Sequence, residues 1–210
     1  MTETAAVNRL DRRKVRTRAA LVAAARELLA SRDPAEVSIQ EITDTADVGF
    51  GSFYNHFESK VELFDAAIEE VFEEQGALFD ALTAEMEDPA EVFASSVRMT
   101  VRMTKTHPQV TKIFQRTGLR YLDASNGLAP RALRDLRRGK ESGRFDIDDP
   151  MVALACAGGS LVGVLALTAI NPDPDAIDAS ADELAVNLLQ MFGLPRDEAR
   201  EIAGRPLPKA

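Results

Sequence analysis

The sequence contains very few of the residues that build disulfides, metal centres and catalytic sites. Its 210 residues include one cysteine, Cys156, and two histidines, His56 and His107. A single cysteine excludes an internal disulfide and a cysteine-based zinc site, and its apolar neighbours indicate a buried, unreactive thiol. The histidines lie far apart, with no nucleophile elbow or phosphate-binding glycine loop. We therefore expect no enzyme activity, no metal and no cofactor.

Alternating strand-like patterns and a secretory signal are also absent. The first seven residues are polar, and basic residues follow them without an apolar segment, so we expect a cytoplasmic protein. Apolar residues instead recur at three- and four-residue spacing along almost the whole chain. The pattern predicts an all-α protein of nine or ten helices. The predicted helices cover about 12–30, 38–46, 50–56, 59–85, 89–107, 109–118, 130–141, 150–170, 180–192 and a short segment from 195.

The charge of the chain is unevenly distributed. A net charge of −9 argues against nucleic acid when it is taken alone. Residues 1–60, however, hold nine Lys/Arg and nine Asp/Glu, so the whole −9 lies in residues 61–210, and residues 9–18 carry six basic side chains against Asp11 alone. A basic arm on a neutral module suits a protein that touches phosphates with one end only. A solvated helix start explains the same charges equally well.

Two short helices joined by a tight turn are predicted after the first long helix. Ser38 and Glu41 have the spacing of a capping box. Asp47 lies where the chain must turn, and Asp tolerates a left-handed backbone better than most residues. This arrangement is a helix-turn-helix. The exposed side of the second short helix offers small and hydrogen-bonding groups, as recognition helices offer to base edges.

The stretch from Ser38 to Leu63, SIQEITDTADVGFGSFYNHFESKVEL, resembles the DNA-binding signature of the TetR family of bacterial repressors. The match includes the family's aromatic run ending in Tyr-x-His-Phe, followed by Ser-Lys, and the specific likeness covers residues 10–65. The resemblance implies a three-helix DNA-binding domain at 10–58 and a helical ligand-binding and dimerisation domain at 59–205. The chain departs from the family where Asp33 and Asp47 replace a frequent glycine and Thr43 replaces a small residue.

The resemblance also implies which residues contact the operator. Phosphate contacts are expected from Ser38, Tyr54, His56 and Lys60, base contacts from Gly49, Phe50, Ser52 and Asn55, and backbone or minor-groove contacts from Arg16 and Arg18. Phe50 stands where the family commonly has a polar base-reading residue, so we expect it to meet a thymine methyl or to cover the duplex surface. Simple packing is the alternative for His56 and Tyr54.

Residues 151–170 carry no charge and are long enough to span a membrane. Acidic flanks, the lack of a basic anchor and the lack of an aromatic belt argue against a span. The small residues instead predict a helix buried between its own core and a second subunit. The resemblance implies a homodimer through a four-helix bundle formed with the helix at 181–192. Its expected interface residues are Ala153, Ala157, Gly159, Gly163, Leu184, Leu188 and Met191.

The resemblance implies a ligand pocket in the second domain. Candidate walls, for each of which ordinary core packing is the alternative, are Phe64, Ile68, Phe72, Phe79, Met99, Met103, Phe114, Thr117 and Tyr121. Few inward charges are evident, so we expect a hydrophobic or amphipathic effector, such as an acyl chain, a drug-like cation or a steroid-like ring.

Together these features predict a ligand-responsive transcriptional regulator with double-stranded DNA, a small molecule and a second copy of itself as partners. We expect a repressor that binds a palindromic operator as a dimer and is released by a small hydrophobic effector. The alternative is a non-catalytic helical interaction protein that does not bind DNA. The sequence does not identify the effector, the operator or the regulated genes, and it leaves activation open.

Overall fold

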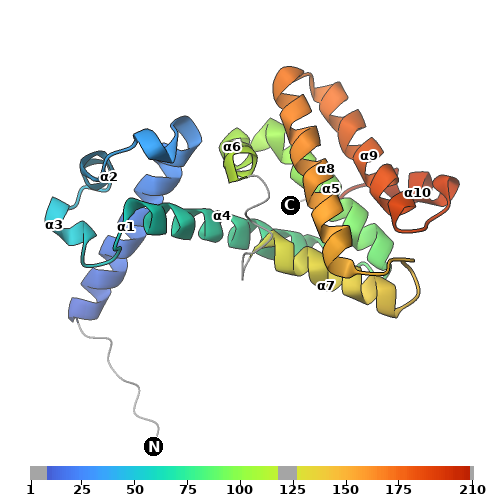
Figure 1. Ribbon diagram of the computed structural model, residues 1–210, viewed down its shortest axis with the longest axis horizontal. Helices are drawn as coiled ribbons and strands as arrows, with labels where there is room; N and C mark the ends of the chain where they lie inside the picture. Colours follow the sequence, from blue (N-terminus) through green and yellow to red (C-terminus); the bar gives the residue numbers. More distant parts are fainter. Residues whose placement is uncertain (1–8, 118–126, 209–210) are drawn as a thin grey trace, which may run out of the picture. The chain divides into compact units, whose positions relative to one another are not determined.

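The computed structural model describes residues 9–117 and 127–208, which fold entirely into helices (Figure 1). Within these ranges there is no strand, and the helix count of ten agrees with the prediction. The helices are α1 Arg9–Ser31, α2 Ile39–Thr45, α3 Phe50–Phe53, α4 Lys60–Thr83, α5 Pro89–Thr106, α6 Pro108–Thr117, α7 Leu128–Glu141, α8 Pro150–Ile170, α9 Pro174–Met191 and α10 Arg196–Ala203. A single 3-10 turn, Pro34–Glu36, lies between α1 and α2.

The chain divides into two compact units inside α4, after Glu70. The predicted boundary lay at the start of this helix, between residues 58 and 59. Because α4 continues without a break from Lys60 to Thr83, it contributes to both units. Each unit is described separately below.

The first unit is a small three-helix core in which α1 packs against α2 and α2 packs against α3. Val22 and Leu29 of α1, Ile42 of α2 and Phe53 of α3 are almost completely buried. Val15 of α1 is by contrast 68% exposed, because this part of the helix extends beyond the small core.

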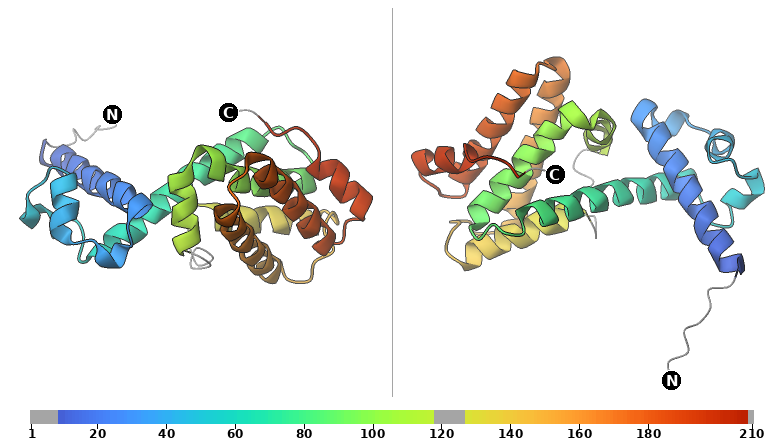
Figure 2. Two further views of the ribbon diagram at one scale, coloured as in Figure 1. Left: turned by 90° about the horizontal axis from the view of Figure 1, so that it is seen from above. Right: turned by 180° about the vertical axis from the view of Figure 1, so that it is seen from behind.

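In the second unit α5 is central and packs against α6, α7, α8, α9 and α10. Helices α8 and α9 lie side by side in every view (Figures 1 and 2). Asp182 of α9 joins α5 through Arg98 at 2.7 Å and Arg102 at 2.8 Å. Arg98 is buried but fully engaged, because it also donates to the carbonyl of Arg205. These charged side chains of α5 therefore bind α9.

The start of α9 differs from the prediction, which placed its N-cap at Ser180. The helix begins at Pro174, because the Asp173 carboxylate accepts the Ala176 N–H and Pro174 fits the first turn. Asp88 and Asp149 cap α5 and α8 in the same way, and these two helices begin where the prediction placed them, at residues 89 and 150. The expected third helix is also shorter than predicted and ends at Phe53.

The apolar helix α8 is only partly covered within the subunit. It is the one helix of the described chain that is long and apolar enough to cross a membrane. Only 33% of its most apolar 18-residue stretch is buried. Cys156, which we expected to be buried, is exposed on its outward side. Packing within one subunit therefore does not account for the apolar character of this helix.

Candidate functional site

The turn between α2 and α3 has the geometry that the sequence predicts. Ser38 Oγ accepts the Glu41 N–H at 3.2 Å, and the Glu41 carboxylate accepts the Ser38 N–H at 2.9 Å, which completes the capping box. Asp47 is the only non-glycine residue with a positive φ, at 51°, in the parts of the chain that the structure describes. These two features fix the direction in which α3 leaves α2, and both confirm the prediction.

Aromatic residues anchor α3 on one side and are exposed on the other. Phe53 is fully buried, and its ring lies 6.1 Å from that of Phe57. Phe50 and Tyr54 are 47% and 57% exposed, and their rings meet edge to face with centroids 6.0 Å apart. The outer face of α3 therefore presents a preformed aromatic pair.

The remaining residues that were expected to contact bases or phosphates lie on or beside this face. Gly49 and Asn55 are exposed, whereas Ser52 and His56 are half-buried. Gly51, which was not among the expected contacts, is exposed as well. A Cβ added to Gly51 meets no atom within 4 Å. Folding of the unit therefore does not require glycine at this position. Close approach of another molecule to the backbone would require it, because a side chain would stand in the way.

Two of the cations assigned to DNA are already bound within the first unit. Lys60 Nζ donates to the carbonyls of Ala35 and Val37 at 2.8 and 2.9 Å. It ties the start of α4 to the segment before α2, a structural role that sequence reasoning missed. Arg18 lies 5.2 Å from the centre of the Phe57 ring and 3.4 Å from the Glu70 carboxylate. Arg16 is exposed.

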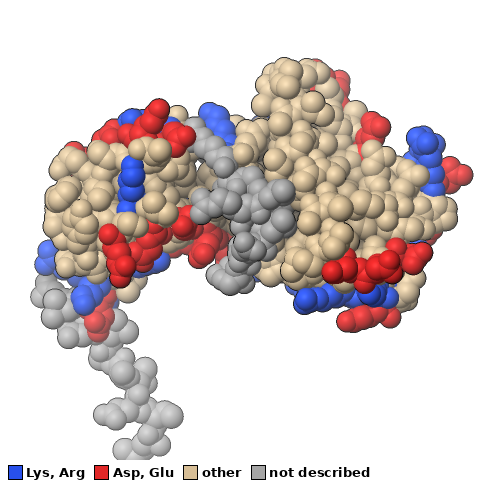
Figure 3. Space-filling model, in the orientation of Figure 1, with Lys and Arg blue, Asp and Glu red and all other residues tan. Residues whose placement is uncertain are grey.

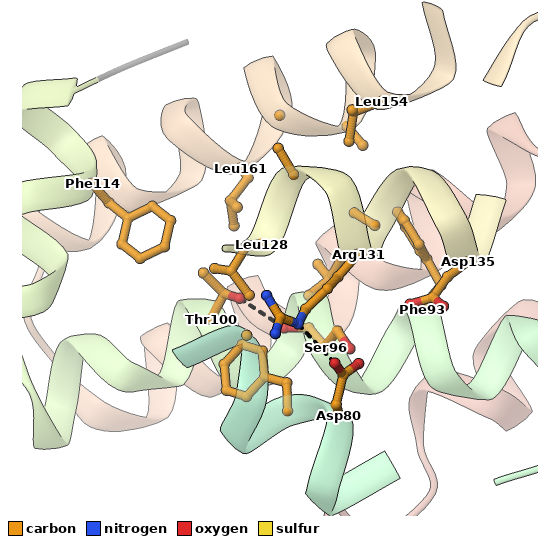
Figure 4. Close-up of a pocket in the computed structure, with 17 residues that line it drawn as sticks. Asp80, Phe93, Ser96, Thr100, Phe114, Leu128, Arg131, Asp135, Leu154 and Leu161 are labelled. Carbon is orange, nitrogen blue, oxygen red and sulfur yellow. Dashed lines mark hydrogen bonds and ion pairs between the residues drawn. The ribbon is translucent and has the colours of Figure 1, made fainter. Parts of the chain in front are cut away.

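The second unit contains a small pocket bounded by α4, α5, α6, α7 and α8 (Figure 4). Its volume is about 70 Å³, several times the roughly 10–15 Å³ that one water needs. Its apolar wall is formed by Gly76, Phe79, Phe93, Val97, Phe114, Leu128, Ala129, Ala132, Leu154, Ala157, Gly158 and Leu161, and its polar groups are Asp80, Ser96, Thr100, Arg131 and Asp135.

Two of the nine predicted wall residues, Phe79 and Phe114, line this pocket. Five of the others, all within the described residues, do not line it, for separate reasons. Phe64 and Ile68 belong to the first unit, and Phe72 stacks against Phe114 with ring centroids 4.4 Å apart. Met99 and Met103 pack beside Phe79 in a cluster that Val110 and Leu207 cover. The side chain of Thr117 and all of Tyr121 lie outside the described residues.

One edge of the pocket is an ion-pair network between α4 and α7, which sequence reasoning missed. Arg131 Nε donates to Asp80 Oδ2 at 2.7 Å, as Figure 4 shows, and Arg134 Nη2 donates to Asp80 Oδ1 at 2.8 Å. Arg134 also donates to Asp135 at 2.9 Å. Ser96 and Thr100 lie on the adjoining face of α5, and Thr100 Oγ1 donates to the Ser96 carbonyl.

The two carboxyl groups of this network differ in their acidity. Burial alone would raise the pKa of Asp80, but hydrogen bonds from Arg134 and Arg131 outweigh it, so the pKa is lowered. Burial of Asp135 has the larger effect and raises its pKa despite the hydrogen bond from Arg134. The pocket therefore offers a stably charged carboxylate beside one that takes up a proton more readily.

The outer surface of α8 is apolar and free of Lys, Arg, Asp and Glu (Figure 3). Gly159 and Gly163 lie on it, and a Cβ added to either meets no atom within 4 Å. Met191 of α9 is 44% exposed as well. The other four predicted interface residues are buried inside the subunit because they face its own core: Ala153, Ala157, Leu184 and Leu188.

Comparisons with known proteins match both units. The family model described as bacterial regulatory proteins, tetR family, matches residues 21–67, and the model of the tetracyclin repressor-like C-terminal domain matches residues 88–205. The probable HTH-type transcriptional regulator ArpR of Pseudomonas putida is 26% identical over 195 residues, which cover 84% of this chain and 90% of ArpR.

Two crystal structures of RolR also match nearly the whole chain. The structure without ligand is 38% identical, with a TM-score of 0.75, and the match covers 91% of this chain and 98% of RolR. The complex with resorcinol is 37% identical, with a TM-score of 0.74, and covers 94% and 98%. The matched models span more than half of the chain, and the chain belongs to the TetR family of transcriptional regulators.

Proposed function

We propose that this protein is a repressor that binds a palindromic operator as a homodimer and leaves it when a small hydroxylated aromatic compound fills the pocket. The observation that carries the DNA-binding part is the outer face of α3, where Phe50, Tyr54, Gly51 and Asn55 are exposed together. Phe53 of the same helix, which packs in the core, is by contrast buried. An exposed set of this kind beside a fixed turn fits the major groove.

Different residues on this face have different tasks in the complex. We assign base reading to Asn55, which is exposed, and close approach of the backbone to the duplex to Gly51, over which there is open space. We assign phosphate contacts to Tyr54, Ser38 and His56. The Lys60 ammonium group donates two of its three N–H hydrogen bonds to backbone carbonyls, so the third N–H is left for a phosphate.

Asn55→Ala is expected to weaken binding to the operator by about 10- to 100-fold, because one base-edge contact is worth ~1–3 kcal/mol. Fluorescence anisotropy with a DNA fragment from the chain's own promoter region measures the change. Asn171→Ala, in the connection before α9, is the matched control and should bind as the wild type does. Equal affinity of Asn55→Ala and wild type would remove Asn55 from the reading surface.

Tyr54→Ala tests the regulator against the alternative of an interaction protein that does not bind DNA. The side chain is 57% exposed, so its removal leaves the core intact. A gel shift that the wild type gives and the variant loses supports the repressor. No salt-sensitive binding of the wild type to such DNA contradicts it.

The pocket favours a small, hydroxylated ring over the acyl chain, drug-like cation or steroid that the sequence suggested. Its volume is small, and apolar walls face a charged edge at Asp80 and Arg131. Flat apolar surfaces suit a ring, and the carboxylate and the hydroxyls of Ser96 and Thr100 suit phenolic O–H groups. RolR, which matches this chain at 37% identity, is known in complex with resorcinol. We therefore take resorcinol as the probe.

Asp80→Asn is expected to weaken resorcinol binding by about 10-fold or more, since a hydrogen bond to a charged group contributes roughly 1.5–3 kcal/mol. Isothermal titration calorimetry measures the affinity. Asp178→Asn, which removes a carboxylate paired with Lys105 on another surface, is the control. Undiminished binding to Asp80→Asn would place the ligand elsewhere.

A further inference from the structure

We propose that Glu73 holds α4 in the DNA-binding state through Arg131, and that a ligand in the pocket releases α4 by engaging that arginine. This inference rests on the proposed function, because it concerns how the pocket regulates DNA binding. Glu73 itself does not line the pocket, whereas Arg131 and Asp80 do. Glu73 is therefore a positioning residue that acts through Arg131.

Arg131 uses its whole guanidinium to join α7 to two points on α4. Its Nη2 and Nη1 donate to the two Glu73 oxygens at 2.7 and 2.8 Å, and its Nε donates to Asp80 at 2.7 Å. Glu73 Oε2 also accepts the N–H of Gly127, at the start of α7, at 3.0 Å. The hydrogen bonds from Arg131 and then Gly127 lower the pKa of Glu73 to about 2, so the carboxylate is charged at neutral pH.

The surface of α4 is shaped to receive this side chain. Glu73, Gly76 and Asp80 occur at intervals of three and four residues, so they share one face of the helix. A Cβ added to Gly76 would lie 2.8 Å from both Cδ and Nη1 of Arg131. Glycine inside a long helix costs about 1 kcal/mol relative to alanine, and here the close approach of the guanidinium explains it.

A ligand at the charged edge of the pocket competes for the same arginine. When ligand oxygens take hydrogen bonds from Arg131 or donate to Asp80, the contacts to Glu73 are strained or broken. Helix α4 runs without a break from Lys60, in the first unit, to Thr83, in the second, so a shift of its Glu73–Asp80 turns reaches the first unit along the same helix. Arg131 therefore has two alternative sets of partners, Glu73 or the ligand, and the choice between them links pocket occupancy to the DNA-binding unit.

Glu73→Ala tests the proposal by the direction of two changes. Operator affinity without ligand should fall about fivefold, because the DNA-binding state loses its tie. Resorcinol affinity of the DNA-free protein should rise or stay level. The substitution lowers the population of the DNA-binding state and raises that of the released state, which is the state that resorcinol favours. The ratio of operator affinity without resorcinol to operator affinity at saturating resorcinol should fall by the same factor. Anisotropy and calorimetry measure these values, and Glu69→Ala, an exposed position on the same helix, should leave all three unchanged.

Gly76→Ala supplies a second variant, because its added methyl group should displace the Arg131 guanidinium without removing a charge. It should lower operator affinity as Glu73→Ala does. Unchanged operator affinity in both variants overturns the proposal, and so does a parallel loss of DNA and resorcinol affinity in Glu73→Ala, which indicates general damage. If resorcinol fails to release the wild-type protein from the operator, the proposed effector is wrong. The operator affinity of Glu73→Ala without ligand still decides whether Glu73 holds the DNA-binding state.

Discussion

Gly159→Arg is expected to convert the proposed homodimer to a monomer and to weaken operator binding by about 100-fold or more. The position faces outward on α8, where an added side chain meets no atom of its own subunit within 4 Å. Of the large hydrophobic side chains, Met151, Val152, Leu167 and Ile170 are 48%, 59%, 58% and 80% exposed on the same helix. A charge placed among them in a helix-to-helix interface is desolvated without a partner.

The size of the effect follows from bivalent binding, in which the two recognition helices of a dimer contact one operator. A dimer holds its second recognition helix at the operator by an effective concentration, which is commonly worth 10²–10⁴ in affinity. Sedimentation velocity measures the oligomeric state, and anisotropy measures the affinity. Ala81→Arg, an equal charge change at an exposed site of α4, should alter neither. A Gly159→Arg protein that stays dimeric would remove the outer face of α8 from the interface.

Local signals were sufficient to predict the first unit. The capping box at Ser38, the left-handed residue at Asp47 and the buried Phe53 and Phe57 each depend on neighbours within a few residues. The same holds for the Asp-Pro starts of α5 and α8. The start of α9 was missed although Asp173-Pro174 carries the same signal, because the prediction began this helix at residue 180.

The pocket edge was not predictable in the same way. Asp80 and Arg131 stand 51 residues apart and meet only when α7 packs on α4. Taken from the sequence, their charges fit a solvated helix surface as well as a binding site. Gly76 was the available signal, because a glycine in the middle of α4 is unfavourable unless something packs closely against it. A single sequence does not reveal which partner does so.

The inward and outward sides of α8 were also mixed in the prediction. A helix that is apolar all round shows no periodicity, so the residues that face a partner cannot be separated from those that face the subunit's own core. Ala153 and Ala157 were therefore placed in the interface together with Gly159 and Gly163. The two sets are separated only in the folded chain, where α8 packs against α5, α6, α7 and α9.

Gly127→Ala is expected to lower the free energy of unfolding by about 3 kcal/mol or more, through backbone strain of ~1–3 kcal/mol and overpacking of similar size. Gly127 precedes α7 with φ 88° and ψ −144°, a region that is almost exclusive to glycine. Its added Cβ would lie 2.6 Å from the Cβ of Phe72. Phe72 cannot yield easily, because it is 2% exposed and stacked on Phe114.

Gly143→Ala separates the two causes. Gly143 also has a positive φ, 71°, but a Cβ there meets nothing within 4 Å. Its substitution should therefore cost only the backbone term, about 1 kcal/mol. Urea unfolding followed by circular dichroism, at one protein concentration so that dimer association is constant, measures both. Equal losses for the two variants would show that the contact of Gly127 with Phe72 contributes nothing. A larger loss at Gly127 shows that this glycine is needed for the close junction of α4 and α7 at which Glu73 accepts its N–H.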